Sequence, residues 1–79
     1  SACEKGWQWQ QVMQLLEEMQ AKGIPANTIT YNAAISAYEK GRQWQRALQL
    51  MKDMQAKGIP ANTITYNAAI SVCEKGRQW

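Results

Sequence analysis

The sequence predicts an all-α fold, specifically an α-solenoid of antiparallel helix pairs. Three observations favour it: an internal repeat of 35 residues, a glycine after a lysine in each half of the repeat, and apolar residues at helical spacing between the glycines. A period of about 20–50 residues is typical of solenoids, in which each unit buries its apolar face against the next. Function in such a fold is expected from a surface that recurs in every repeat rather than from a single pocket.

The two copies of the repeat are nearly identical. The segment IPANTITYNAAIS occurs at Ile24–Ser36 and again, 35 residues later, at Ile59–Ser71. Residues 1–35 and 36–70 differ at eight positions, and residues 71–79 begin a third copy. In the first copy these positions are 3, 7, 11, 12, 13, 16, 17 and 18. The same local structure is therefore expected in every copy.

The chain begins and ends inside a repeat. Because an array of this kind needs about three units for stability, we expect the chain to be a piece of a longer protein. The expected division is a partial repeat at residues 1–27, a complete repeat at residues 28–62 and a partial repeat at residues 63–79. Uncovered apolar faces on the end helices predict self-association or partial unfolding of this chain.

Each repeat is expected to hold two helices, because a lysine followed by glycine ends a helix. The cation suits the carbonyl end, and glycine accepts the left-handed conformation that follows it. In the complete repeat we predict helices at Thr28–Lys40 and Gln43–Lys57, and in the partial repeats at Gln8–Lys22 and Thr63–Lys75. Asn27 is placed to cap the first helix of the complete repeat through its side chain.

Apolar residues mark the buried side of each helix. On the first helix of the complete repeat, the spacing i, i+3, i+4, i+7 predicts a buried stripe of Tyr31, Ala34, Ile35 and Tyr38. On the second helix the corresponding stripe is Trp44, Ala47, Leu48, Met51 and Met54. The tryptophans of this second-helix stripe, Trp9, Trp44 and Trp79, are expected to pack in the core.

The first helix also carries a second, mostly polar strip. Four of its residues lie within about 80° of one another on a helical wheel. They are Ile29, Asn32, Ser36 and Lys40, and the next copy has Ile64, Asn67, Ser71 and Lys75 at the same places. Stacked copies are expected to line one groove with these side chains.

Composition excludes several classes of function. The chain has a net charge of +3, no histidine and two cysteines. It offers neither a catalytic arrangement nor a metal site, so we expect no enzyme activity, no metal and no cofactor. No apolar run approaches the about 20 residues of a membrane-spanning helix, and no membrane association is expected. The mild positive charge favours an anionic partner.

The cysteines and the recurrent glutamates are expected to have structural rather than functional roles. Cys3 and Cys73 lie two repeats apart, too far for a disulfide between stacked units. We expect both to be buried as small apolar side chains. The recurrent glutamates Glu4, Glu39 and Glu74 are expected on solvated faces.

The stretch NTITYNAAISAYEKGRQWQRALQLMKDMQAKGI resembles a pentatricopeptide repeat. The shared features are T-Y-N near the start of the first helix, a K-G break, A-L in the middle of the second helix, and D-M followed by K-G-I before proline. The resemblance covers essentially the whole chain. It implies a right-handed superhelix that binds single-stranded RNA with one base per repeat, in the processing, editing, stability or translation of RNA in mitochondria or chloroplasts.

The resemblance also implies roles for particular residues. In the family, a polar residue near the start of the first helix and the last residue of the same unit read the base, and these match Asn32 and Asn62. This pair of asparagines favours cytosine ahead of uracil. Asn27 and Asn67 match the reading positions of the two incomplete units.

Two further columns match positions that contact RNA in the family. Ile29 and Ile64 match aliphatic residues that sandwich the base between adjacent units. Lys5, Lys40 and Lys75 match a lysine at the end of the first helix that approaches phosphate.

The chain departs from the family pattern near the end of each unit. Pro25 and Pro60 come one place earlier than usual, and asparagine replaces the commoner aspartate at Asn27 and Asn62.

Structural alternatives stand beside each of these roles. Asn27 and Asn62 are also suited to capping a helix, Asn32 and Asn67 to a solvated face, and Lys40 to the carbonyl end of its helix. For the whole chain, the alternative function is a scaffold for protein–protein interaction, since α-solenoids also bind peptides and proteins.

Overall fold

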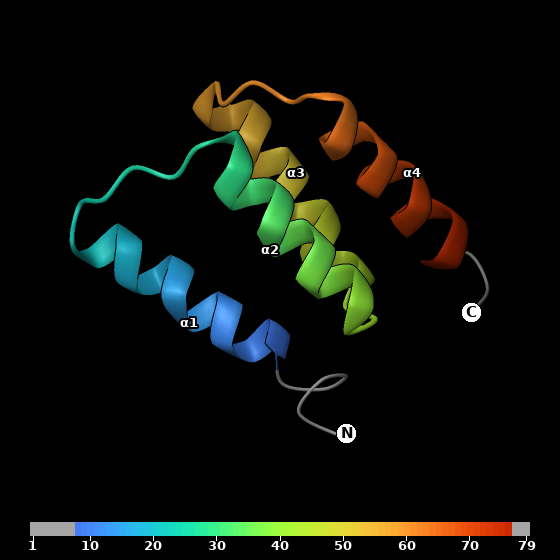
Figure 1. Ribbon diagram of the computed structural model, residues 1–79, viewed down its shortest axis with the longest axis horizontal. Helices are drawn as coiled ribbons and strands as arrows, with labels where there is room; N and C mark the ends of the chain where they lie inside the picture. Colours follow the sequence, from blue (N-terminus) through green and yellow to red (C-terminus); the bar gives the residue numbers. More distant parts are fainter. Residues whose placement is uncertain (1–7, 77–79) are drawn as a thin grey trace.

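The computed structural model describes residues 8–76, which form four α-helices and no strand. Figure 1 shows α1 (Gln8–Ala21), α2 (Thr28–Lys40), α3 (Trp44–Lys57) and α4 (Thr63–Gly76). The predicted all-α fold is confirmed, and each helix begins and ends within one residue of its predicted bounds. None of the described helices is long and apolar enough to cross a membrane.

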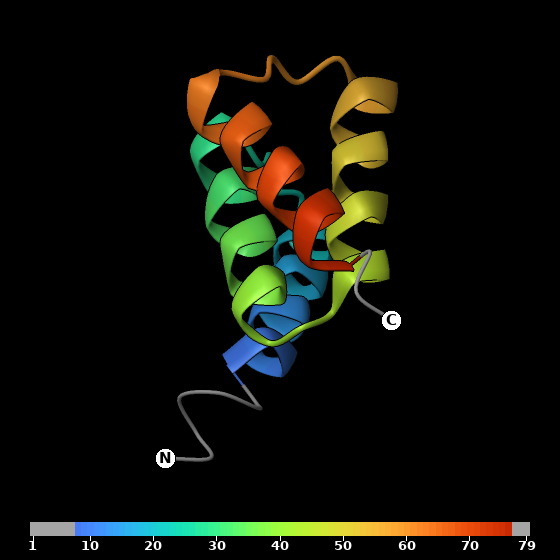
Figure 2. The ribbon, with the colours of Figure 1, turned by 90° about the vertical axis from the view of Figure 1, so that its right-hand side faces the viewer.

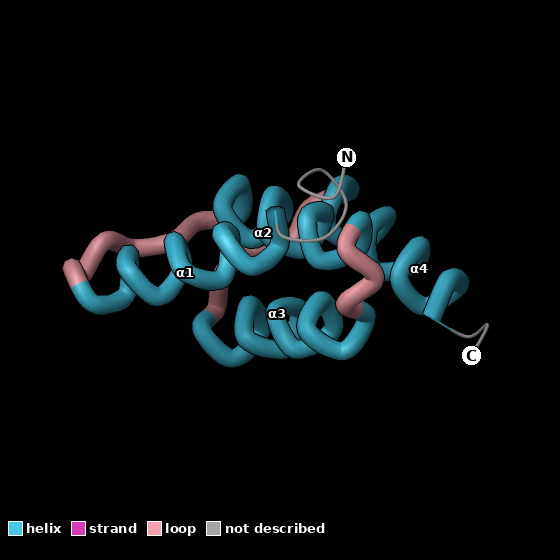
Figure 3. The backbone as a smooth tube through the Cα atoms, turned by 90° about the horizontal axis from the view of Figure 1, so that it is seen from below, coloured by secondary structure: helices cyan, strands magenta, loops and turns pink. Residues whose placement is uncertain are grey.

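The helices are arranged around the α2–α3 pair. These two helices are antiparallel, and Figure 3 shows α1 and α4 on either side of the pair. Figure 2 shows α4 in front, lying against both α2 and α3, in agreement with its contacts. Because α2 and α4 are the first helices of successive repeats, they run in the same direction and place equivalent residues side by side.

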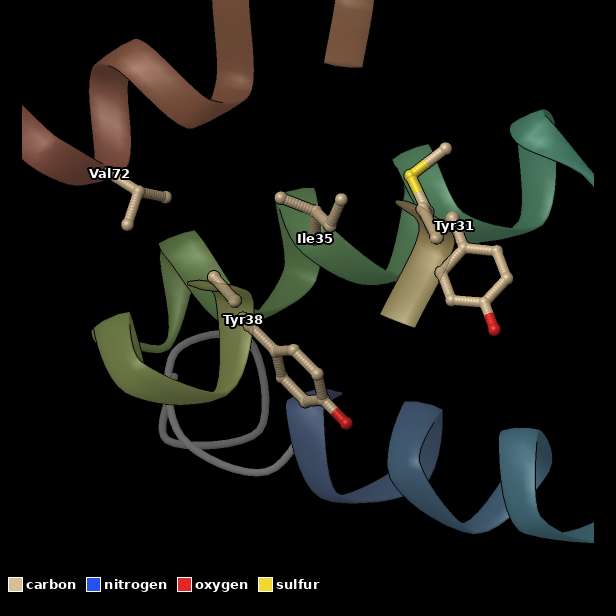
Figure 4. Close-up of a cluster of buried hydrophobic side chains, with 6 residues drawn as sticks. Tyr31, Ile35, Tyr38 and Val72 are labelled. Carbon is tan, nitrogen blue, oxygen red and sulfur yellow. The ribbon is translucent and has the colours of Figure 1, made fainter. Parts of the chain in front are cut away.

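The core lies between α2 and its three neighbours. The predicted stripe of α2, with Tyr31 at one end and Tyr38 at the other, is buried throughout. In Figure 4 the rings of Tyr31 and Tyr38 point from α2 toward α1, and Val72 points from α4 toward α2. Ile35, between the tyrosines, has no exposed surface. The prediction for α2 is therefore confirmed, because this helix has neighbours on several sides.

The stripe of α3 is buried less completely than predicted. Ala47 and Met54 are buried, and Trp44 and Met51 are half-buried, but Leu48 is exposed. In the described residues, α3 packs mainly against α2 and α4. A stripe predicted from the sequence of one helix includes side chains, such as Leu48, that would be buried only if another helix packed against them.

The two described tryptophans pack against the core, as predicted. The ring of Trp9 meets that of Tyr38 edge to face, with 6.2 Å between centroids and 63° between planes. The guanidinium of Arg46 lies 4.8 Å from the centroid of the Trp9 ring. Trp79 lies outside the described residues.

Cys73 is exposed, so the expectation of a buried thiol is wrong. It follows Val72, which is buried, and successive residues of a helix point about 100° apart. Cys3 lies outside the described residues.

The helix ends use glycine in two ways. Gly58 has φ of 71° at the end of α3, the left-handed conformation that was predicted. Gly41 has φ of −84° instead, and the left-handed residue is Arg42, with φ of 61°. A Cβ atom at Gly41 would lie 2.4 Å from Cδ1 of Trp9. Glycine at this position is therefore required by the close approach of α1, not by its own backbone angles.

Candidate nucleic-acid interface

Two asparagines meet where α2 and α4 begin. Asn32 lies in the second turn of α2, and Asn62 immediately precedes α4. The Nδ2 atom of Asn32 donates a hydrogen bond of 3.0 Å to Oδ1 of Asn62. The two residues that the resemblance assigns to one base are thus in direct contact, although Pro60 stands one place earlier than the family pattern has it.

Asn62 also caps α4. Its Oδ1 accepts from the backbone N–H of Thr65 at 3.1 Å, and its own backbone N–H donates to Oγ1 of Thr65 at 3.2 Å. This reciprocal arrangement satisfies backbone donors that the first helical turn leaves unpaired. Asn27 caps α2 in the same way through Thr30, with 3.0 Å between Thr30 N and Asn27 Oδ1. Capping and contact with Asn32 therefore coexist on the side chain of Asn62.

The amide of Asn32 is largely covered. Its residue exposure is 8%, whereas Asn62 and Asn67 are exposed. The alternative of a solvated face for Asn32 is thus wrong. The amide is also less exposed than its place in the polar strip of α2 predicts. Asn32 contacts Asn62 at the end of its own repeat and Thr65 in the following repeat, and neither residue appears on a helical wheel of α2.

The two isoleucines of the strip stand open to solvent. Ile29 in the first turn of α2 is 75% exposed and Ile64 in the first turn of α4 is 62% exposed. The hydroxyl of Thr28 donates to the carbonyl of Pro60, which ties the start of α2 to the loop before α4. Both apolar side chains therefore lie at the end of the helix pair where Asn32 meets Asn62.

The lysines lie at the opposite end of the same helices. Lys40 is exposed at the last residue of α2. Lys75, near the end of α4, pairs with Glu39 of α2, with 3.0 Å between Nζ and Oε2. Lys5 lies outside the described residues. The ends of α2 and α4 thus carry two lysines, Lys40 and Lys75, and Lys75 forms an ion pair with a carboxylate.

Glu39 is not on a solvated face, contrary to expectation, whereas Glu74 is exposed as expected. Glu4 lies outside the described residues. The side chain of Glu39 is 15% exposed, and its Oε2 accepts from the hydroxyl of Ser71 as well as from Lys75. Burial acts to raise the pKa of Glu39, but the hydrogen bonds from Ser71 and Lys75 and the charges of Lys75 and Lys40 outweigh it, so the pKa lies below its ordinary value of 4.5. Glu39 is therefore a carboxylate that links two repeats.

Two residues of this interface were not singled out from the sequence as functional: Thr65 and Glu39. The usable signal for Thr65 was its place three residues after Asn62, the spacing of a capping box. No comparable signal marks the contact of Glu39 with Ser71, because it depends on how far one repeat rotates relative to the next.

Comparison with family models identifies the repeat. The model described as pentatricopeptide repeat domain matches residues 14–75, and the model described as PPR repeat matches residues 1–24. No curated protein matches the sequence. Proteins built from this repeat are helical solenoids that are generally associated with RNA binding rather than catalysis. The chain, with its paired helices and a match over most of its length, belongs to the pentatricopeptide repeat family.

Proposed function

We propose that this chain binds single-stranded RNA sequence-specifically across the adjoining edges of α2 and α4, one base per repeat. The observation that carries the proposal is the 3.0 Å contact between Asn32 and Asn62, which forms one polar site at the end of the helices where two isoleucines are exposed. A base inserted there would have apolar contact on its faces from Ile29 and Ile64, and amide groups at its edge.

The hydrogen-bonding state of Asn62 supports cytosine as the preferred base. Its Oδ1 already accepts from Thr65 N and Asn32 Nδ2, so the group left for a ligand is its Nδ2, which can only donate. Cytosine presents two adjacent acceptors, N3 and O2, on its pairing edge. Uracil carries a proton on N3, which would face another donor. The expected order is cytosine ahead of uracil.

Phosphate contact is assigned to the lysine column of Lys5, Lys40 and Lys75. The net charge of +3 and the exposure of Lys40 at the edge of α2 support it. Phosphate contacts position a nucleic acid without reading its sequence. By family membership, the RNA served would be one that is processed, edited, stabilised or translated in mitochondria or chloroplasts.

The direct test is an NMR titration of the 79-residue chain with short oligocytidine, oligouridine and oligoadenosine, a method that measures weak binding. Oligocytidine is expected to bind most tightly, with shifts concentrated at the starts of α2 and α4. Asn32→Ala should abolish the preference. Tighter binding of oligoadenosine, or an unchanged preference in Asn32→Ala, would refute the proposal, and capture of peptides indifferent to salt would favour the protein scaffold instead.

The role of Lys40 is tested by the salt dependence of binding. Lys40→Gln should weaken binding of every oligonucleotide and lower the slope of log K against log salt by about 0.7, the value for one phosphate of a single strand. Lys52→Gln removes the same charge from an exposed position of α3 and should change the slope less. Equal effects of the two substitutions would mean that Lys40 acts only through net charge.

A further inference from the structure

Two buried polar side chains meet at the junction between α2 and α4. Asn32, at 8% exposure, and Thr65, at 4%, are the two buried polar residues among those that the structure describes. They contact each other, with the hydroxyl of Thr65 donating to Oδ1 of Asn32. Buried polar groups are costly unless they are hydrogen-bonded, and no buried side-chain polar atom of the described residues lacks a partner. The contact between Asn32 and Thr65 is therefore a fully hydrogen-bonded part of the junction between repeats.

The direction of each hydrogen bond follows from one obligate donor. The backbone N–H of Thr65 can only donate, and it lies 3.1 Å from the side chain of Asn62, so the atom facing it is the oxygen of Asn62. Asn32 faces the same oxygen and must present its Nδ2. The Oδ1 of Asn32 is thereby turned toward the hydroxyl of Thr65, which must donate to it.

The single proton of the Thr65 hydroxyl has two acceptors in reach. Oδ1 of Asn62 lies 3.1 Å away, but it already accepts from Thr65 N and Asn32 Nδ2. Oδ1 of Asn32 has no other donor among the described residues. The proton therefore goes to Asn32, and the hydroxyl holds the oxygen of that amide away from the outer surface.

We propose that Thr65 is a positioning residue for base recognition: its hydroxyl fixes the orientation of the Asn32 amide and so keeps the site rich in donors. This inference rests on the proposed function of the Asn32–Asn62 pair. Thr65 itself does not contact the base. The repeat that follows a reading pair would then contribute to the choice of base made by that pair.

The test compares Thr65→Val, which keeps the shape and removes the hydroxyl, with Thr65→Ser, which keeps the hydroxyl. In Thr65→Val the amide of Asn32 loses the partner of its oxygen and can turn over, so the ratio of cytosine to uracil affinity should fall several-fold toward one. Thr65→Ser should restore the ratio. A structural role alone would lower affinity for both oligonucleotides equally and leave the ratio unchanged, which would overturn the proposal.

Thr30→Val is the matched control. Thr30 makes the same capping box with Asn27 but has no amide from a preceding repeat among its described hydrogen bonds. Thr30→Val should destabilise the chain through loss of the capping box but leave the ratio of cytosine to uracil affinity unchanged. A loss of the ratio in Thr30→Val as large as in Thr65→Val would show that cap stability, not amide orientation, sets the ratio.

A second readout separates this inference from the proposed function. In the protein without RNA, the side-chain NH₂ protons of Asn32 should exchange slowly with solvent in the natural sequence and in Thr65→Ser, and faster in Thr65→Val. Failure of the natural chain to prefer oligocytidine would refute the proposed function. Unchanged exchange in Thr65→Val would refute the positioning role of Thr65, whatever the RNA titration shows.

Discussion

The two amide atoms of Asn62 have different roles: the oxygen stabilises the fold, and the nitrogen is available to the proposed ligand. The oxygen of Asn62 caps α4 through Thr65 and accepts from Asn32, whereas its Nδ2 has no acceptor among the described residues. An N-cap interaction contributes about 1 kcal/mol, so the oxygen is held in place while the exposed nitrogen remains available. The Nδ2 atom of Asn62 can therefore be replaced by another atom without loss of the cap.

Asn62→Asp makes that replacement. Aspartate caps a helix as well as asparagine does, so α4 should be kept, but the outer atom becomes an acceptor. It suits the N3–H of uracil and opposes N3 of cytosine, so the preference should change from cytosine to uracil. Comparison of oligocytidine and oligouridine binding checks this. An unchanged preference for cytosine would mean that the outer atom of Asn62 does not meet the base.

Glu39 makes the stability of the helix pair depend on pH. Its pKa is lower in the folded chain than its ordinary value of 4.5, so the ionised form stabilises the fold above that pH, and this stabilisation is lost as pH falls through the folded pKa. Glu39→Gln should cost about 1 kcal/mol near pH 7, the upper end of what a solvent-screened ion pair contributes, because its partner Lys75 is largely exposed.

Urea denaturation at several pH values measures this effect. The difference in unfolding free energy between the natural chain and Glu39→Gln should shrink as pH falls below 4.5, the ordinary value for Glu39. Glu74→Gln, at the equivalent but exposed position of α4, serves as the control and should have a smaller effect. A difference that stays constant down to acid pH would show that the ionised carboxylate of Glu39 contributes no stability.

At the scale of elements, the glycines divide into two kinds. Gly58 ends α3 with a left-handed backbone and has nothing within 4 Å of an added Cβ. Gly41 has an ordinary φ but touches Trp9, and Gly76 meets Trp44 less closely, with 3.3 Å from an added Cβ to the indole Cγ. Glycines of the second kind let a second helix approach the end of the following first helix.

Gly41→Ala and Gly58→Ala should therefore destabilise the chain for different reasons. Gly41→Ala forces Trp9 to move and should cost about 1–3 kcal/mol, as overpacking does. Gly58→Ala places a side chain at positive φ and should cost about 1–2 kcal/mol. In a Trp9→Ala background the cost of Gly41→Ala should nearly vanish and that of Gly58→Ala should persist. Equal costs of Gly41→Ala in both backgrounds would refute the close-approach role.

At the scale of the whole molecule, the end helices carry uncovered apolar side chains. Leu15 on α1 and Tyr66 and Ile70 on α4 are exposed. A cavity of about 300 Å³ between α3 and α4 is lined by Met51 and Tyr66 among others. Burying apolar surface stabilises by about 25 cal/mol per Å², which favours covering these faces with a second copy.

Self-association of this chain is therefore expected, and sedimentation velocity over a range of concentrations measures it. Ile70→Lys should shift the chain toward monomer, because a charge on α4 opposes burial of that face. Gln45→Lys adds the same charge at an exposed polar position of α3 and should leave association nearly unchanged. A chain that is monomeric at every concentration would contradict the expectation.

Much of the fold could be predicted because its causes are local. The capping residue Asn27, the lysine–glycine ends and the stripe from Tyr31 to Tyr38 each depend on residues within a few turns. The exposure of Leu48 could not be predicted in this way, since it depends on which neighbour α3 has.

The candidate site was predicted in part. Family resemblance pointed to Asn32 and Asn62, but not to the burial of Asn32, the part played by Thr65 or the bond of Glu39 to Ser71. Each of these contacts joins residues 30 to 36 positions apart. A helical wheel describes one helix and contains no information on the rotation between successive repeats.

The amino-acid order alone therefore determined four helices, their lengths and the side of α2 that is buried, because hydrogen bonding within a helix and apolar spacing act over short stretches of chain. Only the tertiary structure decided which polar groups face a neighbouring repeat and which face solvent. The physical reason is that an acceptor such as Asn32 Oδ1 is satisfied by whichever donor packing brings within about 3 Å, and packing is a property of two repeats together.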